Sequence, residues 1–249
     1  MPLTPAGRVA ELIRESDSVV ALTGAGISVP SGISDFRSAG SGLWENVNPM
    51  EVAHIDAWRS DPKRFWEFYG QRFGMLADKQ PNQAHRVLAR LEQRGLLDAV
   101  LTQNIDMLHQ KAGTADPVEL HGTIRTSSCL SCGHQVSLEA VVSMLEESPD
   151  GIPRCVCGEP LKPDVVLFGE MLPEAAINRA FDLAAGADLM ICIGTSLEVF
   201  PVASLPEETA RNGGRVVLVT QGPTPWDGRA DVKLDNDVED DLAAVLGAL

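Results

Sequence analysis

Five short apolar runs, each ending in small or polar residues, constrain the fold of this chain more than any other feature. The runs span residues 18–26, 97–106, 163–170, 187–196 and 214–222, and a shorter sixth covers 230–235. Runs that are apolar without polar alternation are typical of strands buried on both faces of a sheet. Helical patterns lie between them, at 82–95, 173–186, 201–214 and 238–249. Alternating strands and helices predict an α/β fold with a parallel sheet and right-handed crossovers.

The length and charge of the chain bound its class. With 249 residues, of which 44% are hydrophobic, it can form one large domain, or one domain that carries a small insert. A net charge of −15 argues against a nucleic-acid binder, because phosphate contacts need a basic face. We expect no sequence-specific nucleic-acid partner.

The start of the chain predicts a helix rather than a targeting segment. Residues 1–17 carry acidic side chains together with the helical spacing of Val9, Leu12 and Ile13. No apolar run approaches the roughly 18 residues of a membrane helix. We therefore expect a cytoplasmic protein without a membrane partner, and the oligomeric state is left open.

Two stretches interrupt the alternation of strands and helices. Residues 38–80 are rich in aromatic side chains and predict a helical insert. Residues 126–160 hold four of the five cysteines and predict a small metal-binding module. The fifth cysteine, Cys192, lies in an apolar run and is predicted to be a buried small hydrophobe.

The four paired cysteines predict one structural zinc ion. Cys129-x-x-Cys132 and Cys155-x-Cys157 form two knuckles that can supply four sulfurs tetrahedrally. Four sulfurs leave no open coordination position, so this zinc would have no catalytic role.

Small and polar residues follow each predicted strand, where ligands bind in parallel α/β sheets. In the turn Thr23-Gly-Ala-Gly-Ile-Ser28, two glycines let the backbone approach a pyrophosphate. A strict GxGxxG would have glycine at Val29, so a plain strand-to-helix turn stays an alternative. The loop Gly32–Arg37 carries Asp, Phe and Arg, which suits a loop that folds over a ligand.

Two further groups are candidates for chemistry. His121 precedes Gly122 just before the cysteine module, and a histidine can take up a proton near neutral pH. Its alternative is a structural histidine. Tyr69 and Arg72 share a helix face, where a phenol and a guanidinium can together bind one carboxylate. Their alternative is a packed Tyr69 beside a solvated Arg72.

Together these motifs resemble the sirtuin family of NAD-dependent protein deacylases. The resemblance covers nearly the whole chain and rests on seven motifs in the family's order. They are GAGIS (24–28), GISDFR (32–37), TQNID (102–106), His121-Gly122, the cysteine quartet, VVLFGE (165–170) and GTSLEV (194–199).

The resemblance implies a Rossmann-like, doubly wound parallel sheet that binds NAD, with a small zinc-binding lobe and a helical insert. Residues 1–37, 81–125 and 161–249 would form the NAD domain. Residues 38–80 would form the cofactor loop and a helical insert with the acyl pocket, and residues 126–160 the zinc-binding module.

The resemblance also implies a role for each matching residue. His121 would be the catalytic base. The cofactor-binding residues would be Gly24, Ala25, Gly26, Ser28, Asp35, Phe36, Arg37, Gln103, Asn104, Ile105, Asp106, Gly194, Thr195, Ser196, Thr220, Gln221 and Gly222. The substrate-binding residues would be Ala39, Tyr69, Arg72, Val166, Phe168, Gly169, Glu170, Leu197, Glu198 and Val199.

The family mechanism implies acyl transfer from lysine to ADP-ribose. The amide oxygen of acyl-lysine attacks the ribose carbon that bore nicotinamide, and His121 then helps to activate a ribose hydroxyl. The products are nicotinamide, free lysine and O-acyl-ADP-ribose. Sirtuins commonly carry Asn at the tip of the penultimate strand, and Thr220 stands there in this chain.

Ala39, Tyr69 and Arg72 resemble the residues that mark the class III branch of sirtuins. This resemblance implies removal of succinyl and malonyl groups, with acetyl also accepted. Two alternatives stay open. The same NAD cleft could serve a mono-ADP-ribosyltransferase, which would add ADP-ribose to a peptide, or a non-catalytic NAD-sensing module, which would function without His121.

Overall fold

The computed structural model describes residues 3–34 and 48–249. Six parallel strands form its larger sheet, in the order β3-β2-β1-β7-β8-β9. They are β1 (Val19–Thr23), β2 (Ala99–Thr102), β3 (Val118–Glu119), β7 (Leu189–Ile193), β8 (Arg215–Val219) and β9 (Val232–Leu234). The predicted doubly wound parallel sheet is confirmed, and β3 is a short strand that the hydropathy pattern missed.

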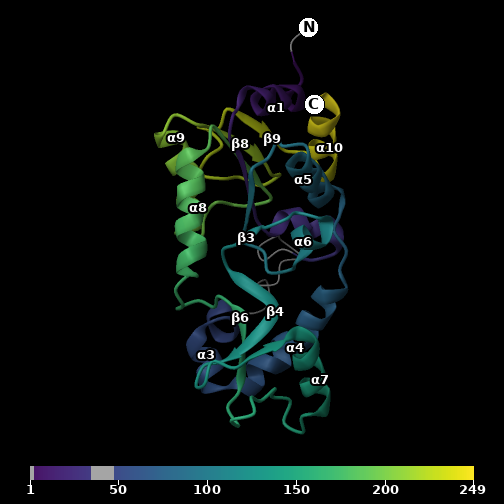
Figure 1. The fold of residues 1–249 in the computed structure, drawn as a ribbon, viewed down its shortest axis with the longest axis vertical. Coiled ribbons are helices and arrows are strands. Elements are labelled where there is room, and N and C mark those ends of the chain that lie inside the picture. The colour runs from purple at the N-terminus through teal and green to yellow at the C-terminus, as the bar shows by residue number, and fades with distance from the viewer. Residues whose placement is uncertain (1–2, 35–47) are drawn as a thin grey trace.

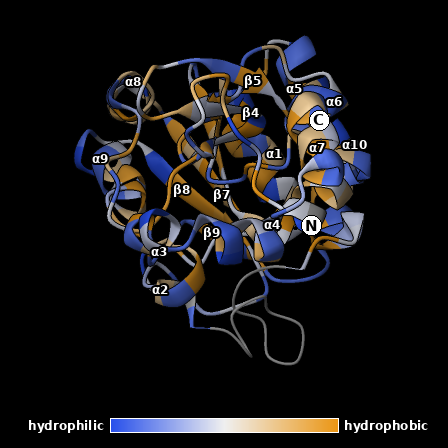
Figure 2. Ribbon diagram, turned by 90° about the horizontal axis from the view of Figure 1, so that it is seen from below, coloured by the Kyte–Doolittle hydropathy of each residue, from blue (hydrophilic) through white to orange (hydrophobic). Residues whose placement is uncertain are grey.

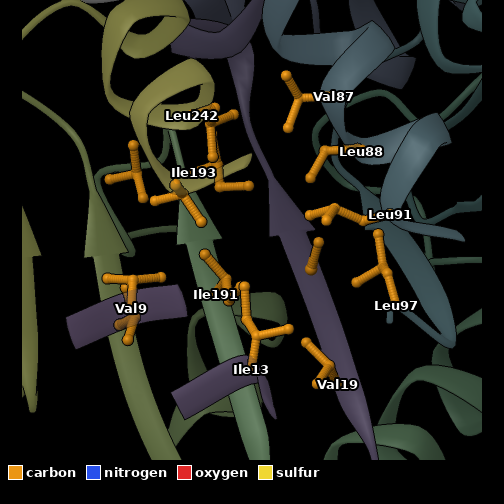
Figure 3. Close-up of a cluster of buried hydrophobic side chains, with 14 of the residues drawn as sticks. Val9, Ile13, Val19, Val87, Leu88, Leu91, Leu97, Ile191, Ile193 and Leu242 are labelled. Carbon is orange, nitrogen blue, oxygen red and sulfur yellow. The ribbon is translucent and has the colours of Figure 1, made fainter. Parts of the chain in front are cut away.

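Helices cover both faces of this sheet. One face packs on α1 (Pro5–Glu15), α5 (Gln83–Gln93) and α10 (Val238–Ala248). The opposite face packs on α8 (Glu174–Gly186) and α9 (Leu205–Arg211), the latter preceded by the 3-10 helix η2 (Val202–Ser204). Figure 3 shows side chains of α1, α5 and α10 converging on β1 and β7. In Figure 2, strands β7 and β8 are largely hydrophobic, and apart from Arg215 at the start of β8 their residues are buried.

A second, smaller sheet is antiparallel. In it β4 (Gly122–Cys129) lies between β5 (Gln135–Ser137) and β6 (Leu161–Val165). The apolar run 163–170 was expected to be a strand of the parallel sheet, and this expectation was wrong, because its strand β6 pairs with β4. A short apolar run shows that a strand is buried, but not which neighbour it pairs with.

The helical insert and the metal-binding module share one hydrophobic core. The insert holds α2 (Pro49–Val52), α3 (Ile55–Ser60) and α4 (Pro62–Asp78), and the module holds α7 (Leu138–Glu147). Trp66 of α4 is buried among residues of α7, β4 and β6, and its indole N–H donates to the carbonyl of Leu161 at 3.0 Å. Figure 1 shows this unit at the opposite end of the molecule from α1, α9 and α10.

Two further helices follow strands of the larger sheet. The 3-10 helix η1 (Ala25–Ser31) follows β1, and α6 (Leu108–Ala112) lies beyond the end of β2. In Figure 1, α6 and β3, an edge strand of the larger sheet, lie on the side of that sheet nearest β4 of the smaller sheet. Among the described residues, no helix has the length and apolar character needed to cross a membrane.

Candidate active site

The parallel register brings the ends of four strands into one row. Thr23 pairs with both Thr102 and Ile193, and Ile193 pairs with Val219. The residues that follow these strands therefore lie side by side at the carboxyl edge of the sheet. They are Gly24, Gln103, Gly194 and Thr220. This is the edge at which ligands bind in parallel α/β folds.

Two of these turns pack backbone against backbone, which explains their glycines. A Cβ added to Gly194 would lie 2.2 Å from the amide nitrogen of Ile27, and one added to Gly26 would lie 2.7 Å from the Cα of Gly194. Gly194 also has a φ of 60°, in the left-handed region that favours glycine. Contact between the two turns, rather than a ligand alone, therefore requires glycine at these positions.

A buried polar network lies beneath the first turn. Ser28 donates to the Asp106 carboxylate at 2.6 Å, and the Asn104 amide donates to the Ser28 hydroxyl at 3.2 Å and to the Gly24 carbonyl at 3.1 Å. Burial raises the pKa of Asp106, while the Ser28 hydrogen bond lowers it. The predicted cofactor residues of the first two strand tips are thus brought together by direct hydrogen bonds.

The second and third strand tips are joined by a side-chain bond. The Gln103 amide donates to the Thr195 hydroxyl at 2.9 Å, and this hydroxyl also accepts from the Leu197 amide at 3.2 Å. Ser196 and Glu198 belong to the same turn, after β7. At the fourth tip, Gln221 follows Thr220, and the Gly222 carbonyl accepts from Lys233 at 2.9 Å.

His121 lies between this edge and the smaller sheet. Its Nδ1 donates to the main-chain carbonyl of Gln103 at 3.0 Å, which leaves Nε2 of the neutral ring as a proton acceptor. Its own carbonyl accepts from the amide of Val166 at 2.8 Å. Burial lowers the pKa of His121, and the Gln103 hydrogen bond opposes this shift. The ring is therefore neutral at pH 7, the state that a general base needs.

Gly122 is required at the junction itself. Its φ is 75°, and a Cβ there would lie 2.1 Å from the Asp164 carbonyl oxygen. Any larger residue would push β4 away from β6 directly beside His121. The His121-Gly122 pair therefore combines a candidate base with the glycine that lets the two segments meet.

The segment 165–170 runs from His121 to the helical insert. The Phe168 amide donates to the Ala53 carbonyl at 2.8 Å, and its carbonyl accepts from the Ile55 amide at 2.9 Å. A Cβ on Gly169 would lie 2.7 Å from the His54 ring. The Phe168 side chain is 46% accessible, so this segment reaches the surface beside the candidate base, and we call residues 165–170 the open edge.

Two buried histidines support the site, and the sequence analysis did not single them out. His109 Nε2 lies 2.9 Å from the Thr23 hydroxyl, and His85 Nδ1 lies 2.9 Å from the Asn82 amide oxygen. Their rings are 4.9 Å apart. Burial is the main cause that lowers the pKa of His85 to about 3 and of His109 to about 4. No local spacing marks these residues, because α5 and α6 meet only in the folded chain.

On α4, Tyr69 and Arg72 both contact the Phe68 ring, and the described residues show no hydrogen bond between the two. The Tyr69 ring stacks on Phe73 with centroids 5.3 Å apart, and burial raises the pKa of its phenol. The Arg72 guanidinium lies 3.9 Å above the centre of the Phe68 ring and donates to the Phe68 carbonyl. The Tyr69 phenol is neutral, and the nearby Arg72 charge partly opposes the rise in its pKa. The Arg72 guanidinium itself rests on the Phe68 ring.

Four predicted residues fall outside the described part of the chain. They are the cofactor-loop residues Asp35, Phe36 and Arg37 and the substrate residue Ala39. Ile105, another predicted residue, packs against the shared core of the insert and the module. Val199 lies after β7, and its carbonyl accepts from the Ala203 amide of η2 at 2.9 Å.

The four paired cysteines lie together at the far end of β4. Their sulfur atoms are all within 4.8 Å of one another, close to the roughly 3.8 Å that tetrahedral zinc bonds of about 2.3 Å require. Cys129 and Cys155 are buried and Cys132 and Cys157 are exposed. Because the eight residues of β4 run from His121 to Cys129, a span of roughly 26 Å at about 3.3 Å per residue, a zinc ion here would be structural.

Comparison with known proteins identifies the family. The profile described as the Sir2 family matches residues 24–201, which is more than half of the chain. The chain belongs to the Sir2 family. This sirtuin is 44% identical over 239 residues to the NAD-dependent protein deacetylase of Saccharolobus solfataricus, a match that covers 96% of this chain and 95% of that protein. It is 43% identical to the NAD-dependent protein deacetylase of Thermotoga maritima, with 92% of each chain covered.

Solved structures agree with this assignment. A Sir2 bound to a deacetylated p53 peptide and 3'-O-acetyl ADP ribose is 41% identical and superposes with a TM-score of 0.92, with 96% of each chain covered. Sir2Tm bound to a propionylated peptide is 41% identical, with a TM-score of 0.88 over 96% of each chain. The predicted fold class and the predicted cofactors of the chain, NAD and a structural zinc ion held by four cysteines, are confirmed at the level of the family.

Proposed function

We propose that this sirtuin is an NAD-dependent protein-lysine deacylase that removes acetyl groups and, in addition, malonyl and succinyl groups. The position of His121 carries the proposal, because its ring bonds to Gln103 at the strand tips and its carbonyl bonds to Val166 of the open edge. The relatives named above as NAD-dependent protein deacetylases support the acetyl part.

The strand tips fit NAD by the chemistry of their donors. Amides and hydroxyls of Gln103, Asn104, Ser28 and Thr195 gather there, with Asp106 as a buried carboxylate, and such groups suit ribose hydroxyls and a carboxamide. The glycine turns bring the backbone close enough for a pyrophosphate. When bound, NAD supplies the ribose carbon that receives the acyl oxygen and releases nicotinamide.

The open edge and the turn after β7 would hold the substrate between them. An extended peptide adds to exposed backbone by main-chain hydrogen bonds. In this proposal Val166, Phe168 and Gly169 form one side of the channel, and residues 197–199 form the other. His121 Nε2 would accept the proton of a ribose hydroxyl, and the Gln103 carbonyl would stabilise the protonated ring.

Acyl selectivity would come from α4. A neutral Tyr69 phenol can donate to a carboxylate, and Arg72 can bind it through its guanidinium fork. Arg72 now rests on Phe68 in a cation–π contact, which is worth about 0.5–2 kcal/mol. A malonyl or succinyl carboxylate offers a charged partner instead, whereas an acetyl group does not. The carboxylate would therefore draw Arg72 from Phe68.

The test is an NAD-dependent assay on one lysine peptide that carries acetyl, malonyl or succinyl. Mass spectrometry should show loss of the acyl group and formation of O-acyl-ADP-ribose; a peptide that instead gains ADP-ribose would support the transferase alternative. Arg72→Met should lower desuccinylation far more than deacetylation. Arg64→Met removes an exposed arginine of the same helix and should change neither. Equal losses in Arg72→Met would overturn the carboxylate part and leave deacetylation standing.

Three parts of the sequence interpretation stay predictions. These are the cytoplasmic location, the absence of a nucleic-acid partner and the absence of a membrane partner. The division into an NAD domain, an insert with the acyl pocket and a zinc-binding module is part of the proposal. One correction applies: the module's sheet includes β6 and the start of β4, which lie outside residues 126–160.

A further inference from the structure

A buried lysine lies directly behind the open edge. The Lys162 side chain is 7% accessible, in strand β6. Its ammonium donates to the carbonyls of Pro163 at 3.0 Å and Val165 at 2.9 Å, and to the Glu170 carboxylate at 2.8 Å. All three hydrogens of this buried cation are therefore matched to acceptors, as burial of a charge demands.

Glu170 completes a closed loop with this lysine. The carboxylate oxygen that accepts from Lys162 also accepts from the Leu167 amide at 2.9 Å. The Glu170 amide in turn donates to the Leu167 carbonyl at 3.0 Å. The ion pair thus joins residue 162 to residue 170 and fixes the turn between them. We call this arrangement the Lys162–Glu170 clamp.

The clamp acts on the segment that contacts His121. Val166 lies inside it and donates to the His121 carbonyl, and Phe168 lies inside it and bonds to Ala53 and Ile55. The clamp holds the Leu167 amide through Glu170, while these backbone bonds hold Val166 and Phe168 on either side of it. A loosened clamp would let residues 166–169 shift relative to His121 without breaking either sheet.

We propose that Lys162 is a positioning residue for the substrate peptide: through Glu170 it holds the backbone of 166–169 in the shape to which an acyl-lysine peptide adds. This inference rests on the proposed function, since it assumes that this edge binds the peptide. The Glu170 side chain then acts by shaping the turn, while the backbone of the segment meets the substrate.

The clamp predicts that its loss raises the KM for the peptide but not the KM for NAD. The strand tips that would hold NAD belong to the larger sheet, whereas the hydrogen-bond and ion-pair partners of the Lys162 ammonium lie within residues 163–170. Lys162→Met should therefore raise the KM for an acetyl-lysine peptide by about tenfold while the KM for NAD stays within about twofold. A general loss of stability would lower the active fraction and leave both KM values unchanged.

The ion pair itself is tested by a double-mutant cycle. Glu170→Gln keeps an oxygen for the Leu167 amide but removes the charge, and should raise the peptide KM less than Lys162→Met does. The double variant Lys162→Met/Glu170→Gln should be no worse than Lys162→Met alone, because the second change removes the carboxylate that the first left unpaired. Arg215→Met, which breaks an exposed ion pair with Glu15 at the opposite end of the strands, is the matched control and should change neither KM.

The stability, KM and cycle measurements together support or overturn the role of Lys162. Melting temperature shows which variants are folded, and Glu170→Gln carries the test if Lys162→Met does not fold. An unchanged peptide KM in a folded variant, a parallel rise in the KM for NAD, or additive effects in the cycle would overturn the proposal. If the wild-type chain binds an acetyl-lysine peptide by calorimetry but does not turn it over, the proposed function fails, and the loss of peptide affinity in the same variants still tests the clamp.

Discussion

The His121 ring and the Gln103 main-chain carbonyl are hydrogen-bonded at 3.0 Å, across the junction between the two units of the molecule. This bond fixes the proton of the neutral ring on Nδ1 and leaves Nε2 to accept one. Because a backbone carbonyl makes the bond, the tautomer is set by the position of β2 relative to β4. The arrangement leads to the first two predictions.

Replacing His121 should abolish turnover without abolishing NAD binding. His121→Gln keeps a polar side chain of similar size but cannot accept the proton, so we expect kcat to fall by about 10²–10⁴-fold. NAD affinity, measured by calorimetry, should change little because the other strand tips are intact. Retention of most of the deacylase activity would remove His121 as the base and favour a binding role for the chain.

The activity should have an acid limb set by His121. Burial holds its pKa below the ordinary value of 6.5, so the neutral ring prevails at pH 7, and protonation removes the base as the pH falls through the folded value. We expect kcat/KM to be flat near neutrality and to decline with a midpoint below 6.5. A profile from pH 5 to 8 checks this, and a midpoint well above 6.5 would contradict it.

Acid should destabilise the fold through His85 and His109. Their pKa values are about 3 and about 4 in the folded chain and near 6.5 when unfolded, so between these values the unfolded chain binds protons that the folded chain does not. Lowering the pH from 7 to 5 should thus reduce the free energy of unfolding by about 2 kcal/mol for each ring. Asp106, whose pKa burial raises, opposes this at lower pH.

One variant of a buried histidine and one of an exposed histidine separate this effect from general acid sensitivity. His109→Gln should lower stability at pH 7 but flatten the dependence of the melting temperature on pH. His134→Gln, at an exposed position, should leave the slope as it is. Equal slopes in both variants would show that His109 does not cause the loss.

Loss of the metal should unfold the smaller unit first. Cys129 and Cys155 belong to the core that the insert shares with the cysteine module, so removing zinc loosens both together. Cys132→Ser should lower zinc content and abolish deacylation, and its calorimetric melting should show an early transition. Cys192→Ala removes the fifth cysteine and should keep one zinc per chain. An active Cys132→Ser protein without zinc would refute a structural role for the metal.

The contact between the two glycine turns should tolerate no side chain. Gly194→Ala forces a Cβ to 2.2 Å from the Ile27 amide, so the turns must separate; we expect a loss of about 2–4 kcal/mol in stability and of NAD affinity. Gly228→Ala is the control, since a Cβ there meets no atom within 4 Å. Thermal melting and NAD calorimetry on both variants make the comparison, and equal stability would contradict the contact.

Local patterns in the sequence determined much of this protein. Apolar runs and helical spacing predicted the parallel sheet, the first helix and the helices α5, α8 and α10, because each depends on residues close in the chain. The cysteine spacing predicted the cluster for the same reason. Seven motifs in order predicted the family, which the comparisons confirmed.

Only the tertiary structure decided which segments meet. The run 163–170 was read correctly as apolar, yet β6 pairs with β4 and builds the open edge. The aromatic residues of the insert and the cysteine module were read as two additions, and they share one core around Trp66. No local pattern predicts His85, His109 or Lys162. The rings of His85 and His109 meet only when α5 and α6 pack together, and the partners of the Lys162 ammonium lie across a turn. Hydropathy and spacing act within a segment, whereas strand pairing and the burial of single polar groups depend on packing between segments. That packing places His121 between the strand tips and the open edge.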